Sequence, residues 1–115
     1  MRAYIGPYTR GNRRRIIRIT THRYDHWSAY NTIALVTVPV LKRLRACNIG
    51  HPACLESEQW EQYLDQMIWS LEQCIEDDEP MYGDTEAEQD AYWAWNDLVQ
   101  EGLDLFGMFF RHLWD

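Results

Sequence analysis

Three cysteines and one nearby histidine are the side chains of this sequence that could bind a metal ion. Cys47, His51 and Cys54 follow one another at short intervals, and thiolate and imidazole are ligands that zinc accepts. Cys74 or His22 would have to supply the fourth ligand. The spacing matches no common zinc module, and Cys47 and Cys74 fall on or near apolar helix faces, where small buried thiols are commonplace. We therefore expect reduced thiols, no metal site and no cofactor.

A second group with chemical potential contains His22, Asp25 and His26. Together with the distant Glu72, these side chains could act as a general acid and base. A connector between a strand and a helix, in which Asp25 holds backbone amides, explains the same residues more simply. The sequence contains no GxSxG or HExxH motif and no phosphate-binding glycine loop. We predict that the protein is not an enzyme, and a small enzyme centred on Asp25 is the less favoured alternative.

Charge is divided unequally between the two halves of the chain. Residues 1–53 contain ten Lys or Arg and one acid, whereas residues 54–115 contain one basic residue and seventeen acids. The first half therefore carries a net charge of +9 and the second half −16. Either the halves face each other in the fold, or they present two surfaces of opposite sign.

The basic half offers a candidate site for nucleic acid, because arginines and tyrosines are interleaved near its beginning. The favoured interpretation is that these arginines pair with the acidic half, whose excess of charge is larger. Nucleic-acid binding is the alternative, and its candidate residues are Arg10, Arg13, Arg14, Arg15 and Arg18.

The acidic half offers a candidate site for a protein partner. Its acids gather in residues 56–61 and 76–90, where they could imitate a phosphate backbone, although acidic runs are usually solvated faces. Three large aromatic residues, Tyr82, Trp93 and Trp69, lie outside the apolar stripes and add a surplus of apolar surface, which usually marks an interface. The candidate partner-binding residues are Glu76, Asp77, Asp78, Glu79, Tyr82, Asp84, Glu86 and Trp93.

The N-terminal elements follow from β-branched residues and breakers. Residues 3–8 indicate a short edge strand that ends at Gly6-Pro7, and Gly11 marks a turn. Residues 14–20 have the isoleucine content of a second strand. We predict a two-stranded β-hairpin within residues 1–24.

Three helices are expected after the hairpin, over residues 28–47, 57–77 and 86–114. Ser28, Ser57 and Thr85 are their expected N-caps. Pro39 lies inside the first helix and is expected to kink it. The predicted apolar face of the first helix is Ile33, Val36, Val40, Leu44 and Cys47, and that of the second is Trp60, Leu64, Met67, Ile68, Leu71 and Ile75.

The last helix has the strongest apolar pattern and is expected to organise the core. Its seam recurs in alternating steps of three and four. Gly102 and Gly107 would each cost ~1 kcal/mol relative to alanine in a helix, so we expect a neighbouring element to approach closely at both. The seam is Tyr92, Trp95, Val99, Gly102, Phe106, Phe109 and Leu113.

These elements predict an α+β fold with a mainly helical core. A chain of 115 residues is expected to form a single domain, residues 1–115, and the apolar surplus favours a homodimer. No run of eighteen apolar residues and no apolar leader segment is present, so we expect neither a membrane span nor a signal peptide.

The sequence also resembles a family of small uncharacterised tailed-bacteriophage proteins over nearly its whole length. The residues that carry the resemblance are Ile5-Gly6-Pro7-Tyr8, Tyr24-Asp25-x-Trp27-Ser28, Thr32-x-Ala34, Pro39-x-Leu41-x-x-Leu44, Gly50-x-Pro52, Leu64-Asp65-x-Met67-Ile68-Trp69-x-x-Glu72, Gly102-Leu103-x-Leu105-Phe106-Gly107 and Leu113-Trp114-Asp115. Tyr30 and Ile49 stand where the family usually has an acid and a histidine, and its loop before the second helix is longer. The resemblance implies a phage origin and little chemistry.

Together these observations favour a small, non-enzymatic binding protein of phage origin. We expect it to act in the host cytoplasm by occluding a host or anti-phage defence protein, with an anti-CRISPR inhibitor of a CRISPR effector as the concrete case. A nucleic-acid-binding accessory protein that uses the arginine hairpin is the alternative.

Overall fold

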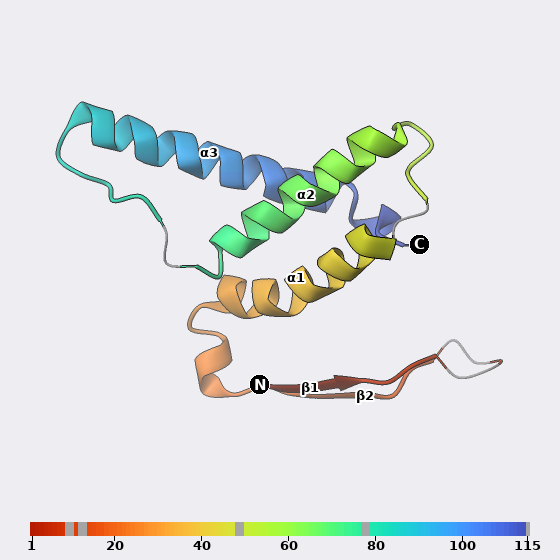
Figure 1. The fold of residues 1–115 in the computed structure, drawn as a ribbon. Coiled ribbons are helices and arrows are strands. Elements are labelled where there is room, and N and C mark those ends of the chain that lie inside the picture. Colours follow the sequence, from red (N-terminus) through yellow and green to blue (C-terminus); the bar gives the residue numbers. More distant parts are fainter. Residues whose placement is uncertain (9–10, 12–13, 48–49, 77–78, 115) are drawn as a thin grey trace. The chain divides into compact units, whose positions relative to one another are not determined.

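The computed structural model describes residues 1–8, 11, 14–47, 50–76 and 79–114 (Figure 1). The chain divides into two compact units, residues 1–32 and 33–115, and each is described by itself. A two-stranded antiparallel hairpin precedes three helices, which confirms the predicted α+β fold. The single domain expected from the length stays a prediction.

The hairpin consists of β1, Arg2–Ile5, and β2, Ile17–Thr20. Ile5 lies opposite Ile17 and Arg2 opposite Thr20. The strands are shorter than the predicted ranges 3–8 and 14–20. Gly6 still donates a backbone hydrogen bond to the Ile16 carbonyl at 2.8 Å, but Pro7 has no N–H and cannot continue the ladder.

Helix α1, Ala29–Cys47, follows a short 3₁₀ turn, η1, Arg23–Asp25. Its bounds agree with the predicted 28–47, and Pro39 lies inside it. The predicted apolar face was wrong, because the stripe that α1 buries lies beside the predicted one. The buried residues are Ala34, Val38 and Leu41, and of the predicted residues Leu44 is half-buried while Ile33, Val36, Val40 and Cys47 are exposed.

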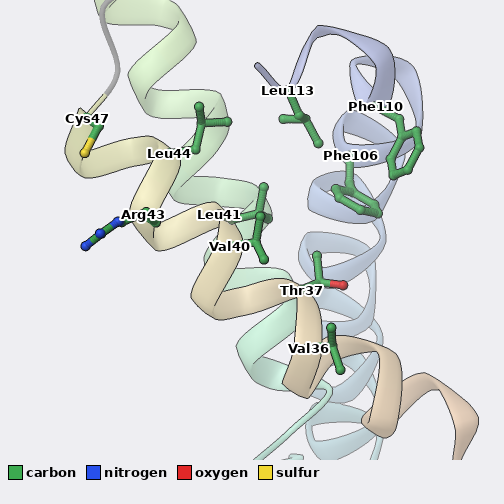
Figure 2. Close-up of a pocket in the computed structure, with 10 residues that line it drawn as sticks. All are labelled: Val36, Thr37, Val40, Leu41, Arg43, Leu44, Cys47, Phe106, Phe110 and Leu113. Atoms are coloured by element: carbon green, nitrogen blue, oxygen red, sulfur yellow. The ribbon is translucent and has the colours of Figure 1, made fainter. Parts of the chain in front are cut away.

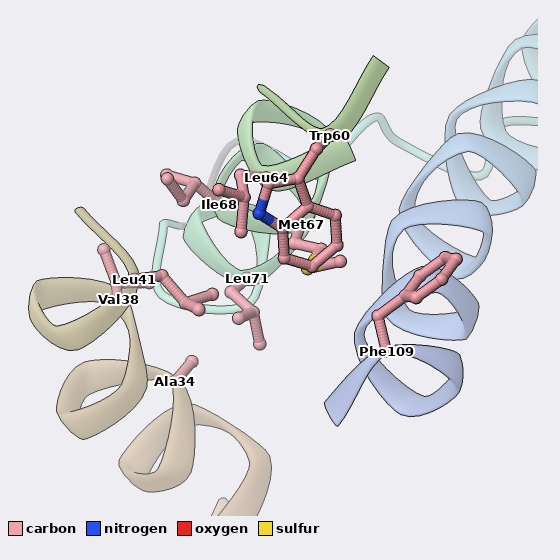
Figure 3. Packing of buried hydrophobic residues seen from close by; sticks show 9 residues of the cluster. All are labelled: Ala34, Val38, Leu41, Trp60, Leu64, Met67, Ile68, Leu71 and Phe109. Atoms are coloured by element: carbon pink, nitrogen blue, oxygen red, sulfur yellow. The ribbon is translucent and has the colours of Figure 1, made fainter. Parts of the chain in front are cut away.

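Helix α2, Ser57–Gln73, lies at the centre of the core (Figure 3). The predicted face is confirmed for Trp60, Leu64, Met67, Ile68 and Leu71, which are all buried, whereas Ile75 lies beyond the end of the helix and is half-buried. The helix is shorter than the predicted 57–77. Its N-cap is Glu56 rather than Ser57, and no side-chain cap forms there.

Helix α3, Glu86–Met108, is followed by a second 3₁₀ turn, η2, Phe110–His112. The prediction of one helix over 86–114 was therefore wrong beyond Met108. The Thr85 cap is confirmed, because its hydroxyl accepts the Glu88 N–H at 3.2 Å.

The predicted central role of the last helix was wrong, because α2 contributes most of the buried residues. Figure 3 shows α2 with the buried residues of α1 on one side and Phe109 on the other. The Phe109 ring meets Trp60 edge-on, with 5.5 Å between ring centroids. A middle helix has two neighbours, so it buries more of its surface than either of them.

Salt bridges join the basic end of α1 to α2. Lys42 Nζ lies 3.4 Å from a Glu72 carboxylate oxygen, and Arg45 contacts Asp65 at 2.9 Å and Glu61 at 3.7 Å. Residues of the basic and acidic halves of the sequence therefore face each other here. No helix among the described residues is long and apolar enough to cross a membrane.

Candidate functional site

The loop before α3 and the first turns of α3 form a surface that combines aromatic rings and carboxylates, which we call the acidic–aromatic surface. Tyr82, Tyr92 and Trp93 contact one another pairwise, with ring centroids 5.3 to 6.2 Å apart and ring planes nearly perpendicular. Tyr82 is 55% exposed and Trp93 is 52% exposed. Edge-to-face contacts of this kind hold large apolar rings in place at the surface.

Hydrogen bonds tie this surface to the helices. Trp95 Nε1 donates to Gln73 Oε1 of α2 at 3.2 Å, and Gln89 Nε2 donates to the Gly83 carbonyl at 3.1 Å. A hydrogen bond with the Glu79 carboxylate raises the pKa of the Tyr92 hydroxyl, and burial adds to this effect. The rings are therefore positioned before any partner arrives, which reduces the entropy lost on binding.

Four of the predicted partner-binding acids are exposed. Glu79 and Asp84 lie in the loop, Glu86 begins α3, and Glu76 follows α2. None of these carboxylates makes an ion pair with another residue of the described ranges. The structure thus gathers Tyr82, Trp93, Glu79, Asp84 and Glu86 around one loop and helix start. Asp77 and Asp78 lie outside the described residues.

The arginine segment is described only in part, because Arg10 and Arg13 lie outside the described residues. The Arg15 guanidinium donates to the Gly6 carbonyl and lies over the Tyr8 ring, 4.9 Å from its centroid. Arg14 is exposed, and Arg18 is exposed opposite Tyr4 on β1. Arg15 therefore has a structural role in the hairpin. Arg18 and Tyr4 instead place an exposed cation and an exposed aromatic ring at opposite positions of the two strands.

Asp25 holds a backbone amide, as the favoured interpretation predicted, and it also contacts the Met1 ammonium. Its carboxylate accepts the His22 N–H at 2.6 Å and lies 3.2 Å from the Met1 ammonium. Thr32 Oγ1 donates to the Asp25 carbonyl at 3.0 Å. The hydrogen bond from His22 N–H is the main cause that lowers the pKa of Asp25, and the Met1 ammonium adds to it. Glu72, the distant partner of the enzyme alternative, forms an ion pair with Lys42.

Replacing Asp25 by asparagine should destabilise this turn at neutral pH. Because its folded pKa is lowered, the carboxylate stabilises the folded state above its unfolded pKa, about 3.9. This contribution is lost as the pH falls through the folded pKa. Native-state hydrogen exchange should show weaker protection of the His22 backbone amide in Asp25→Asn than in wild type at pH 7. Protection should become equal below the folded pKa of Asp25, where the wild-type carboxyl is protonated.

The matched control for this prediction is Asp97→Asn. Asp97 is an exposed acid of α3, and its replacement should leave the His22 amide unchanged at every pH. Equal protection of His22 in wild type and Asp25→Asn at pH 7 would show that the carboxylate does not hold this amide.

The five residues considered for zinc do not form a cluster. Cys47 and Cys54 are exposed, and burial raises the pKa of the Cys74 thiol, which donates to the Ser70 carbonyl at 3.5 Å. A metal ligand must be the thiolate, which a raised pKa disfavours. Within the described ranges, no group of three or more His, Cys, Asp or Glu residues is arranged to hold a metal ion.

Sequence reasoning missed a groove between α1 and the end of α3 with η2. Figure 2 shows side chains of the two walls on either side of it, and its volume is about 740 Å³. The sequence did contain a signal for this groove, because apolar residues of α1 occupy more than one helical stripe and only one stripe can face the core. The lining residues are Val36, Thr37, Val40, Leu41, Arg43, Leu44, Cys47, Phe106, Phe110 and Leu113.

The fold and these two surfaces define a small α+β protein with an exposed acidic–aromatic surface and an apolar groove. The chain matches no protein-family model, no curated protein and no solved structure in the comparisons made with each. The resemblance to tailed-phage proteins therefore stays a prediction.

Proposed function

We propose that this protein is a non-enzymatic binding protein that occludes a basic surface of another protein through its acidic–aromatic surface. The observation that carries the proposal is the exposed ring cluster of Tyr82 and Trp93 beside Glu79, Asp84 and Glu86. Rigid aromatic side chains are the commonest energetic centres of interfaces. Surrounding carboxylates complement a basic partner and speed its association.

The class of partner follows from the charge. A surface rich in carboxylates competes for the same basic grooves that bind a nucleic-acid backbone. Combined with the phage resemblance, this supports a host or defence protein that binds nucleic acid, such as a CRISPR effector, as the target in the host cytoplasm. An anti-CRISPR inhibitor is the concrete case. The expected homodimer is a separate prediction, which analytical ultracentrifugation tests.

A pull-down from bacterial lysate tests this proposal. The tagged protein should retain a protein partner in stoichiometric amount, and Tyr82→Ala with Trp93→Ala should weaken that binding about tenfold or more, since the rings are proposed as hot spots. Trp114→Ala is the matched control, because Trp114 is an exposed indole outside this surface. Retention of the partner by the double variant at wild-type affinity would contradict the proposal.

Nucleic-acid binding by the hairpin is the second candidate, and the strand register favours it. Arg2, Tyr4 and Arg18 lie on one face, because Tyr4 is opposite Arg18 and side chains alternate along each strand. Stacking on tyrosine with nearby arginine is a common way to bind single strands. This candidate predicts that nucleic acid elutes with the wild-type protein at low salt and is lost at high salt. It also predicts that an Arg18→Glu variant retains no nucleic acid. Both results together would favour this candidate over the first.

A further inference from the structure

We infer that the groove between α1 and the α3–η2 segment binds an amphipathic helix with acidic side chains from a partner protein. One wall consists of Val36, Val40 and Leu44 of α1 (Figure 2). The other consists of Phe106 of α3, Phe110 of η2 and Leu113. The groove shares no residue with the acidic–aromatic surface, so the inference does not depend on the proposed function.

The groove has the composition and length that a helix requires. Val40 is 64% exposed and Phe110 is 60% exposed, so its walls leave large apolar side chains in water. From Val36 to Cys47 the α1 wall rises about 17 Å, which is about three helical turns. A docked helix of that length places apolar side chains at i, i+3 or i+4, and i+7 along such a groove.

Charge at the rim specifies an acidic ligand. Lys42 and Arg45 of α1 already pair with carboxylates of α2. Arg43 lies between them in the sequence, lines the groove, and makes no ion pair with a described residue. Figure 2 shows its guanidinium pointing away from Phe106, Phe110 and Leu113, on the outer side of α1. A carboxylate on the polar side of a docked helix could therefore reach Arg43 while the apolar side fills the groove.

The same charge argues against α1 of a second copy as the occupant. Helix α1 contains three basic residues and no acid, so an α1 helix from a second copy would bring no carboxylate to Arg43. Pairing of α1 with α1 of a second copy would therefore place only basic residues of the two helices at the rim, whereas an acidic helix neutralises Arg43.

Two labelled peptides test the inference by fluorescence anisotropy. Each is an amphipathic helix of about eighteen residues with leucine on one face, and the polar face carries glutamate in the first peptide and lysine in the second. We expect the wild-type protein to bind the glutamate peptide more tightly. The protein has a net charge of −7, so non-specific attraction would favour the lysine peptide instead.

Variants locate the binding and test its charge. Val40→Asp should weaken the glutamate peptide at least about tenfold, because it places a carboxylate on the apolar wall. Leu35→Asp is the matched control, since Leu35 is an exposed apolar residue of α1 outside the groove. Arg43→Glu should reverse the preference, so that the lysine peptide binds more tightly. Circular dichroism should show an unchanged fold in all three variants.

Two results would overturn the inference. One is a glutamate peptide that binds Val40→Asp as tightly as wild type, or that binds no more tightly than the lysine peptide. The other is a dimer that Val40→Asp disperses in sedimentation experiments while neither peptide binds, which would make a second copy the occupant.

Discussion

Gly102→Ala is expected to destabilise the protein, although alanine is the better helix former. A Cβ atom at Gly102 would lie 1.9 Å from Ser70 Oγ and 2.7 Å from the Gln66 carbonyl oxygen of α2. Ser70 is fully buried and donates to the Leu98 carbonyl at 3.4 Å, so it has little room to move. Overpacking costs typically 1–3 kcal/mol, roughly, against a gain of up to ~1 kcal/mol in helix propensity.

Gly107→Ala is the matched control on the same helix and should have the opposite effect. Among the described residues, no atom of a neighbouring element lies within 4 Å of a Cβ atom at Gly107, so the variant should gain up to ~1 kcal/mol. Urea unfolding followed by circular dichroism measures both variants against wild type. Equal stabilisation by the two alanines would show that α2 and α3 do not approach closely at Gly102.

The two glycines show what a local pattern can and cannot predict. Both lie on apolar rows of the same predicted helix, and both were expected to allow close approach of a neighbour. That expectation is confirmed at Gly102 and wrong at Gly107, which is exposed. The difference depends on where α2 crosses α3, and no residue of α3 alone encodes that position.

The end of the last helix illustrates the same limit. No proline or turn-forming sequence ends α3 at Met108, so the apolar periodicity predicted continuation to residue 114. The Phe109 N–H still bonds to the Leu105 carbonyl, but the next turn tightens, with His112 N–H bonded to the Phe109 carbonyl. Phe109 packs against Trp60 and Tyr63 of α2, so tertiary packing accompanies the change in backbone.

The candidate sites show the same difference between contacts that are local in the sequence, which could be predicted, and contacts between distant segments, which could not. The role of Asp25 was predictable, because the carboxylate bonds to an amide only three residues away. The contact between the Tyr82 and Tyr92 rings, in contrast, depends on how the loop before α3 folds back on that helix, which no local pattern predicts. The groove was missed because its two walls are more than fifty residues apart and because Val36 and Val40 were assigned to the core.

Leu41→Ala should cost about 2–5 kcal/mol of the free energy of unfolding, whereas Val40→Ala should change it by less than about 0.5 kcal/mol. Leu41 is 2% exposed and belongs to the core cluster. Its truncation removes contacts with α2 and leaves a cavity. Val40 is its immediate neighbour and is mostly exposed, so its truncation leaves no cavity, and alanine is the better helix former.

This pair of variants decides which stripe of α1 is buried. The apolar face expected from the sequence contained Val40 and not Leu41, so it requires the opposite order of effects. Chemical denaturation of both variants under one set of conditions compares them directly, and a larger loss for Val40→Ala would contradict the orientation of α1 described here. If the order is as expected, Val40 contributes little to folding. Its large apolar surface then needs another explanation, and the binding of a helix in the groove supplies one.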